Sequence, residues 1–154
     1  MKIAVGADHA GFALKQKIIE YLTGNGFNVE DVGTYSSESV DYPSYAFKVG
    51  EAVRDKRVDF GILVCYSGIG MAIAVNKVKG VRAALCHDVR SAGLARKHND
   101  ANVICLGSNF IDPKELPAIL SAFLNSEFEG KTADGERHKR RVKMIERYEN
   151  KHKT

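Results

Sequence analysis

The chain of 154 residues contains no tryptophan, only three prolines and three cysteines, and no long apolar run. Its most apolar stretch, residues 60–75, includes three glycines and is shorter than the roughly 20 apolar residues that a membrane-spanning helix requires. The amino terminus, "MKIAVGADHAGF", reaches Asp8 too early for a signal peptide. These absences favour a cytoplasmic protein, and the length suits a single domain over residues 1–154.

The three cysteines, Cys65, Cys86 and Cys105, are odd in number and include no CxxC pair. Each lies in or at the end of an apolar run, where a cysteine usually serves as a small buried hydrophobe. A structural zinc site is not expected without paired ligands. The sequence alone therefore predicts no metal centre.

The positive charge is concentrated near the carboxyl terminus. The net charge is +4, but residues 131–154 carry nine Lys or Arg against four Asp or Glu. Residues 130–154 form a basic segment that is predicted to be helical from about Gly135. Three interpretations stay open: a nucleic-acid contact, a solvated helix face, or a site for a small anion. Nucleic acid is least favoured because the segment lacks a recognition-helix context and interleaved aromatics.

Apolar runs typical of strands alternate with amphipathic segments typical of helices. Strands are expected at residues 2–7, 28–33, 59–65, 81–86 and 101–107. Helices are expected at residues 11–22, 41–55, 67–76, 88–99 and 112–127, with a last one from about 135. This alternation predicts an α/β fold, a doubly wound parallel sheet with helices on both faces. The last helix follows the completed sheet, so we expect it to reach a dimer partner.

The stretch "CYSGIGM", residues 65–71, follows a strand and precedes a helix. It lacks the GK[ST] of a phosphate-binding P-loop and the third glycine of a dinucleotide fingerprint. It also lacks the arginine of a cysteine phosphatase, because Met71 stands at that position. Two interpretations remain open. The glycines merely permit a tight turn, or a thiol base faces amides that hold an enolate oxygen.

Three further motifs each allow a structural and a functional interpretation. Asp8 and His9 follow the first strand. Asp8 could simply cap the next helix, or the two residues could form an acid–base pair that faces the ligand crevice. His98 and Asn99 end a helix, where both residue types are favourable for structural reasons alone. Arg137 and Arg141 share one helix face, as solvated charges or as a grip for a phosphate. Together with Cys65, these groups are expected to gather at one edge of the sheet.

Five segments carry a family resemblance: "DHAGF", "DYPSYA", "CYSGIGMAIAVNK", "RKHNDANVICLGS" and "ERHKRRV". In this order they resemble the ribose-5-phosphate isomerase B family, which also contains galactose-6-phosphate isomerase subunits. The resemblance runs from Lys2 to about Tyr148. It implies a Rossmann-like sheet, a homodimer as the minimum unit, and neither a metal nor an organic cofactor. The implied reaction interconverts ribose 5-phosphate and ribulose 5-phosphate in the pentose phosphate pathway. Whether two dimers associate further stays open.

The resemblance also implies a role for each site residue. Cys65 would be the base that moves a proton between C1 and C2, because Met71 replaces the glutamate that some relatives use. Asp8 and His98 would open the furanose ring. The other implied contacts are Ser67 to the moving hydroxyl proton, the amides of Gly68, Ile69 and Gly70 to the enediolate oxygen, Tyr42 and Asn99 to the sugar, and His9, Arg137 and Arg141 to the phosphate.

One position departs from the family pattern. Many members have an arginine after the "GS" of "LGS", where this chain has Asn109. That phosphate contact is either missing or replaced, with Arg140, Lys139 and His138 as the candidate replacements. Two alternative functions stay open: isomerisation of a six-carbon aldose phosphate, such as allose or galactose 6-phosphate, and non-catalytic binding of a sugar phosphate.

Overall fold

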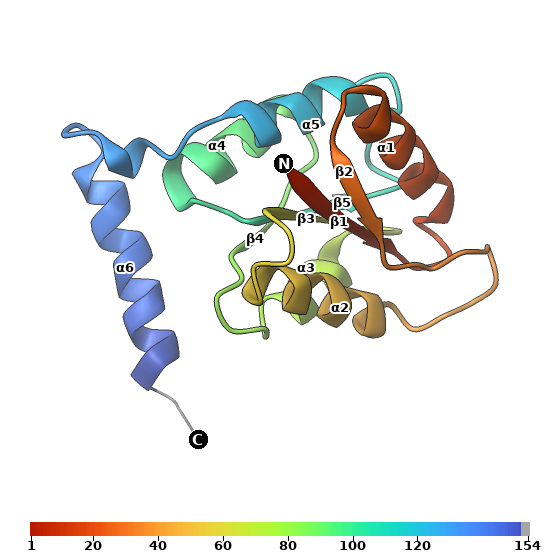
Figure 1. The fold of residues 1–154 in the computed structure, drawn as a ribbon, viewed down its shortest axis with the longest axis horizontal. Helices are drawn as coiled ribbons and strands as arrows, with labels where there is room; N and C mark the ends of the chain where they lie inside the picture. The colour runs from red at the N-terminus through yellow and green to blue at the C-terminus, as the bar shows by residue number, and fades with distance from the viewer. Residues whose placement is uncertain (152–154) are drawn as a thin grey trace.

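Five parallel strands form a single sheet in the computed structural model, which describes residues 1–151 (Figure 1). Residues 152–154 of the predicted basic segment lie outside the described residues. The strand order is β2-β1-β3-β5-β4. The bounds are β1 Lys2–Ala7, β2 Asn28–Asp31, β3 Phe60–Cys65, β4 Ala83–Leu85 and β5 Val103–Gly107. The predicted α/β fold with a doubly wound parallel sheet is confirmed.

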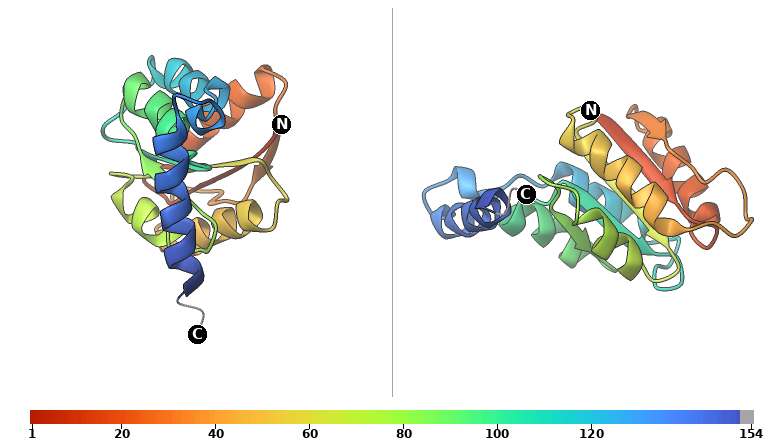
Figure 2. Two further views of the ribbon diagram at one scale, coloured as in Figure 1. Left: turned by 90° about the vertical axis from the view of Figure 1, so that its left-hand side faces the viewer. Right: turned by 90° about the horizontal axis from the view of Figure 1, so that it is seen from below.

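Helices cover both faces of the sheet. Helices α1, α4 and α5 lie on one face, α2 and α3 lie on the other, and α6 stands at one end of the molecule (Figures 1 and 2). The bounds are α1 Phe12–Gly24, α2 Tyr42–Arg54, α3 Ile69–Val75, α4 Val89–Asn99, α5 Leu116–Asn125, the 3-10 turn η1 Glu129–Lys131 and α6 Glu136–Lys151. Each sheet face therefore has its own apolar core, one with α1, α4 and α5 and one with α2 and α3.

Two helix starts, those of α4 and α5, test the local sequence signals. Asp88 caps α4 as expected, because its Oδ1 accepts a 2.6 Å hydrogen bond from the Ser91 amide. The predicted start of the fifth helix at Asp112 is wrong. Helix α5 begins at Leu116, and Asp112 instead closes the preceding turn by accepting from the amides of Lys114 and Glu115. An Asp-Pro pair suits such a turn as well as it suits a helix start.

Phe123 anchors the core between α5 and the sheet. Its side chain is fully buried and meets the ring of Phe60 edge-on, with centroids 5.6 Å apart. We expect Phe123→Ala to lower the free energy of unfolding by about 3–5 kcal/mol, because burial is lost and a cavity remains. Urea unfolding of the two proteins measures this difference. A change below about 1 kcal/mol would contradict this packing of Phe123 against the sheet.

Helix α6 packs against its own chain along one narrow stripe. His138 and Val142 are buried in that contact. Near its end, the Glu149 carboxylate accepts from the Gly80 amide at 3.0 Å, and Glu146 lies 3.4 Å from Arg82. A second stripe, beside this contact on the helix surface, is exposed: Arg137, Arg141, Met144 and Tyr148. The spacing of four, three and four residues places these side chains on one helix face.

No helix within residues 1–151 has the length and apolar character needed to cross a bilayer.

Candidate active site

The sheet reverses its winding direction between β1 and β3. The chain passes from β1 to β2 on one side, and β3 then lies on the other side of β1. In open α/β sheets the carboxyl ends of two such strands border the usual ligand crevice. Asp8 and Cys65 occupy those two ends, and the Asp8 amide donates to the carbonyl of Val64 at 3.2 Å. The fold thus brings this carboxylate and this thiol together.

The loop after β3 wraps its amides around its own side chains. The Gly68 amide donates to Cys65 Sγ at 3.1 Å. The Ile69 amide donates to Ser67 Oγ at 3.2 Å. Gly70 lies in the first turn of α3, where amides have no acceptor within the helix. A substrate oxygen bound by these amides would share or displace the hydrogen bonds that Gly68 and Ile69 now donate to Cys65 and Ser67.

Gly68 has no substitute in this loop. Its φ is +76°, in the left-handed region, and a Cβ there would lie 2.6 Å from Leu85 Cδ1 and 2.9 Å from the carbonyl carbon of Leu106. Sequence spacing alone left open whether the glycines only form a turn. In the structure the left-handed conformation of Gly68 both forms the turn and directs the Gly68 amide toward the Cys65 thiol.

Two more of the predicted residues border this loop. The ring of Tyr42, the first residue of α2, lies over Gly70 so closely that a Cβ there would be 2.6 Å from the ring. His9 is exposed, and its Nδ1 accepts from the Val40 amide at 3.2 Å. This bond leaves Nε2 as the nitrogen of His9 that can donate to a ligand.

Asp8 is also a structural residue. Its side chain is buried, and Oδ1 accepts from the Gly11 amide at 3.1 Å in the turn before α1. The interpretation of Asp8 as a helix cap is wrong, because Gly11 is the N-cap of α1 and Asp8 closes the turn before it. The interpretation of Asp8 and His9 as an acid–base pair stays a prediction. A carboxylate fixed in this way keeps one orientation beside the Cys65 loop.

The second group of predicted residues lies elsewhere. His98 is in the last turn of α4, and its ring stacks on that of His138 from α6, with centroids 4.2 Å apart and planes 8° apart. Glu129 of η1 approaches both rings, 3.6 Å from Nε2 of His98 and 3.8 Å from Nε2 of His138. Sequence reasoning missed Glu129, because no local signal links η1 with the end of α4.

His138 is the buried member of this stacked pair. The side chain of His138 is buried, and burial lowers its pKa. The charges of Arg137, His98 and Arg141 lower this pKa further, whereas Glu129 raises it. His138 is therefore biased toward the neutral form beneath the more exposed His98.

The expectation that all four motifs gather at one sheet edge is wrong for a single chain. A helix that follows a strand returns toward the edge where strands begin, so the end of α4 lies beside the start of β5. The six residues of β3, about 17 Å of strand, separate that edge from Cys65. In Figures 1 and 2, α6 and the loop after β2 lie at opposite ends of the molecule.

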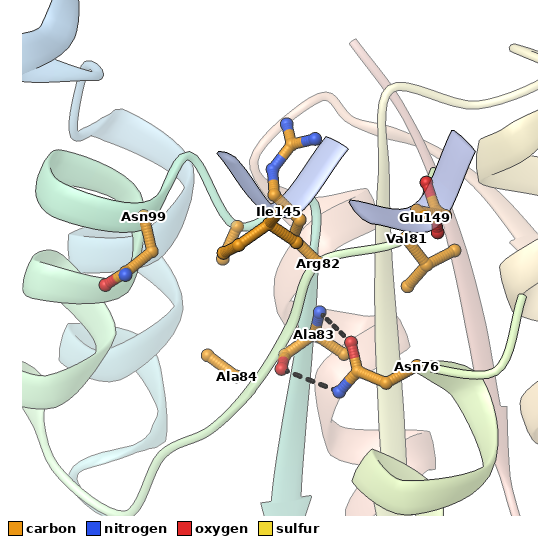
Figure 3. Close-up of a pocket in the computed structure, with 9 residues that line it drawn as sticks. Asn76, Val81, Arg82, Ala83, Ala84, Asn99, Ile145 and Glu149 are labelled. Carbon is orange, nitrogen blue, oxygen red and sulfur yellow. Dashed lines mark hydrogen bonds between the residues drawn. The ribbon is translucent and has the colours of Figure 1, made fainter. Parts of the chain in front are cut away.

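Asn99 lines a cleft between α4 and α6 at this far edge. The cleft has a volume of about 400 Å³, and Ile145 and Glu149 of α6 form its outer wall (Figure 3). Asn76 closes the floor by a reciprocal pair of hydrogen bonds with Ala83. The cleft thus lies next to His98 and away from Cys65.

Asn109 lies at the same edge of the sheet as Cys65, where the strands end. Its amide donates to the carbonyl of Tyr66 at 3.1 Å. The residues expected to replace the missing arginine, Lys139, Arg140 and His138, are on α6 and so lie at the opposite edge of the same chain. None of them can substitute for that arginine within one chain.

The other two cysteines fit the structural role expected from sequence. Burial raises the pKa of Cys86 to about 11 and the pKa of Cys105 well above its usual value. Both thiols are therefore protonated near neutral pH and poor nucleophiles. Of the three cysteines, only Cys65 lies at a strand end with both the Asp8 carboxylate and the loop amides of residues 68–70 nearby.

The fold and the site define a class: a doubly wound α/β protein with a carboxylate and an amide-bonded thiol at its switch point. The model of the Ribose/Galactose Isomerase family matches residues 3–145. The chain belongs to this family.

Relatives named as ribose-5-phosphate isomerase B align over nearly all of the chain. Ribose-5-phosphate isomerase B of Escherichia coli K12 is 45% identical over 144 residues, 94% of this chain and 93% of the relative. The structure of the Clostridium thermocellum ribose-5-phosphate isomerase B superposes with a TM-score of 0.94 at 42% identity, covering 99% of this chain and 100% of the other. The Mycoplasma genitalium enzyme, solved with bound ribulose 5-phosphate, gives a TM-score of 0.89 at 44% identity, covering 97% and 96%.

Proposed function

We propose that this protein is a sugar-phosphate isomerase that interconverts ribose 5-phosphate and ribulose 5-phosphate. The observation that carries the proposal is the hydrogen bond from the Gly68 amide to Cys65 Sγ, beside Asp8 at the switch point. An aldose–ketose isomerisation needs a base that can reach both C1 and C2, and a donor for the oxygen that becomes negative. Membership of the family and the relatives' names support the same reaction.

Chemistry begins with opening of the furanose ring. In our proposal His98 and Asp8 act as a pair, one giving a proton to the ring oxygen and the other taking the proton of the C1 hydroxyl. The ring C1–O bond breaks, and the open-chain aldehyde forms. Tyr42 and Asn99 would hold the sugar hydroxyls during this step.

Proton transfer through an enediolate follows. Cys65 takes the proton from C2, and the electron pair moves to the carbonyl oxygen on C1, which the amides of Gly68, Ile69 and Gly70 stabilise. Ser67 passes the hydroxyl proton from the C2 oxygen to the C1 oxygen, and Cys65 returns its proton to C1. Met71 cannot act as the base, since it is a fully buried thioether in the core.

A second copy of the chain would complete the site. Asp8, His9 and Cys65 lie at one edge of the sheet, and His98 and Arg137 lie at the other. These groups can act on one small sugar only if two chains each contribute one edge. We therefore propose a homodimer in which the exposed stripe of α6 approaches the partner's Cys65 loop. The partner's Arg137 and Arg141, with His9, would then hold the phosphate.

We further propose that the protein forms one domain and acts in the cytoplasm, where the pentose phosphate pathway supplies its substrate. The direct test is an isomerase assay on ribose 5-phosphate, allose 6-phosphate and galactose 6-phosphate, with and without a chelator. We expect ribose 5-phosphate to be preferred and the chelator to have no effect. Preference for a six-carbon substrate would favour the alternative within the same family. Sugar-phosphate binding without turnover would favour a non-catalytic module.

Arg137 tests the phosphate grip. A guanidinium that binds the non-reacting phosphate contributes equally to substrate and transition state. We expect Arg137→Ala to raise KM about 10-fold or more while kcat changes little. Steady-state kinetics with Arg147→Ala, on the same helix, as a control measure this effect. A fall in kcat at unchanged KM would contradict a phosphate role.

A further inference from the structure

The proposed reaction uses only His98 from the cluster of His98, Glu129 and His138, and gives Glu129 and His138 no role. Three elements, α4, η1 and α6, meet at these side chains, and α4 is distant in the sequence from the other two. Glu129 lies within 4 Å of a nitrogen of each histidine. Among the described side chains, Nε2 of His138 is a buried polar atom without a hydrogen-bond partner.

A metal ion is one occupant to consider, because two imidazoles and a carboxylate lie within 4.8 Å of one another. The ring geometry speaks against it. An imidazole nitrogen binds a metal through a lone pair that lies in the plane of the ring. The planes of His98 and His138 are 8° from parallel with centroids 4.2 Å apart, so the two lone pairs do not meet at one point. One ring would have to leave the stack before both could bind.

The arrangement instead suits the orientation of one histidine. His138 forms a flat, buried surface that holds the ring of His98 in place. The Glu129 carboxylate approaches Nε2 of His98 and favours a proton on that nitrogen. Nδ1 is then the nitrogen that exchanges a proton with a ligand. A carboxylate has the same effect on the histidine of a Ser-His-Asp triad.

We propose that Glu129 is a positioning residue for ring opening, which holds the His98 imidazole in one tautomer and orientation against His138. This inference rests on the proposed role of His98. The charged groups that face the cluster are Glu129 from η1, and Arg137 and Arg141 from α6, whose charges act on His138. Glu129 is the only carboxylate among those groups, so its negative charge is the one that opposes the two guanidinium charges.

Ring opening and proton transfer can be measured separately. Ribulose 5-phosphate carries its phosphate on O5, so it cannot close a five-membered ring and remains an open chain. Exchange of its C1 hydrogen with deuterium oxide needs the Cys65 step but no ring opening. Conversion of ribose 5-phosphate needs both. A positioning role predicts that the two rates separate, whereas a damaged fold lowers them together.

The experiment compares Glu129→Gln with Glu127→Gln, which alters an exposed carboxylate two residues earlier. For Glu129→Gln we expect conversion of ribose 5-phosphate to fall about 10- to 100-fold. Deuterium exchange into ribulose 5-phosphate should stay within about twofold of the unaltered protein, and Glu127→Gln should change neither rate. In NMR titration the pKa of His138 should fall further in Glu129→Gln, since Glu129 raises it in the unaltered protein.

Several outcomes would overturn the inference. Equal loss of both rates in Glu129→Gln would make Glu129 a structural residue, and no loss would leave it without a role. Inhibition of the unaltered protein by micromolar Zn²⁺ that disappears in Glu129→Gln would identify a metal site instead. If the unaltered protein itself fails to convert ribose 5-phosphate, the proposed function fails, and that result is distinct from the three above.

Discussion

Replacing Cys65 by alanine is expected to reduce isomerisation of ribose 5-phosphate by about 1,000-fold or more, because the reaction loses its only base between C1 and C2. The thiol lies at the end of β3 and accepts the Gly68 amide, so the variant also loses the group around which that amide is arranged. The phosphate contacts proposed for His9 and the arginines do not involve the sulfur. Binding of sugar phosphate should therefore persist.

Turnover and calorimetric binding measure the two halves of this prediction. Cys86→Ala is the matched control, because it removes another buried thiol without touching the loop. Its turnover should stay close to that of the unaltered protein. Near-normal turnover in Cys65→Ala would refute the base assignment, and loss of binding together with turnover would point to a collapsed loop.

Mixing two inactive variants is expected to restore about a quarter of the activity. If each site takes Cys65 from one chain and His98 from the other, then a dimer of Cys65→Ala with His98→Asn has one fully altered site and one intact site. Random pairing makes about half of the dimers mixed, and each has one working site of two. The expected recovery is therefore about 25% of the unaltered activity, starting from two proteins that are almost inactive.

Co-expression of the two variants gives the randomly paired population for this assay. If the two chains carry different affinity tags, the mixed dimer can be isolated from it and should show about half of the unaltered activity. The control mixes each variant with a tagged copy of itself and should remain inactive. A mixed dimer no more active than its parents would mean that the site is built within one chain. The distance between the sheet edges would then require a rearrangement of α4 and α6 that the structure does not contain.

The sequence by itself determined the helices and strands, and the chemistry of the sheet edge at which the strands end. Alternating apolar runs and amphipathic segments predicted the parallel sheet, since burial on both faces makes strands such as β3 apolar throughout. The residues that follow a parallel strand lie at its carboxyl end, so Asp8 and Cys65 could be assigned to the ligand edge from local pattern. The motif "CYSGIGM" also excluded three loop types by spacing alone.

Only the tertiary structure decided which groups meet. His98 follows β4 by a whole helix, and that helix carries it back to the opposite edge, about one strand length from Cys65. Its contacts with Glu129 and His138 join segments about 30 and 40 residues apart, and no local periodicity encodes such distances. Local pattern reports whether a residue is buried or helical. The direction in which each helix returns across the sheet decides which of those residues can act together.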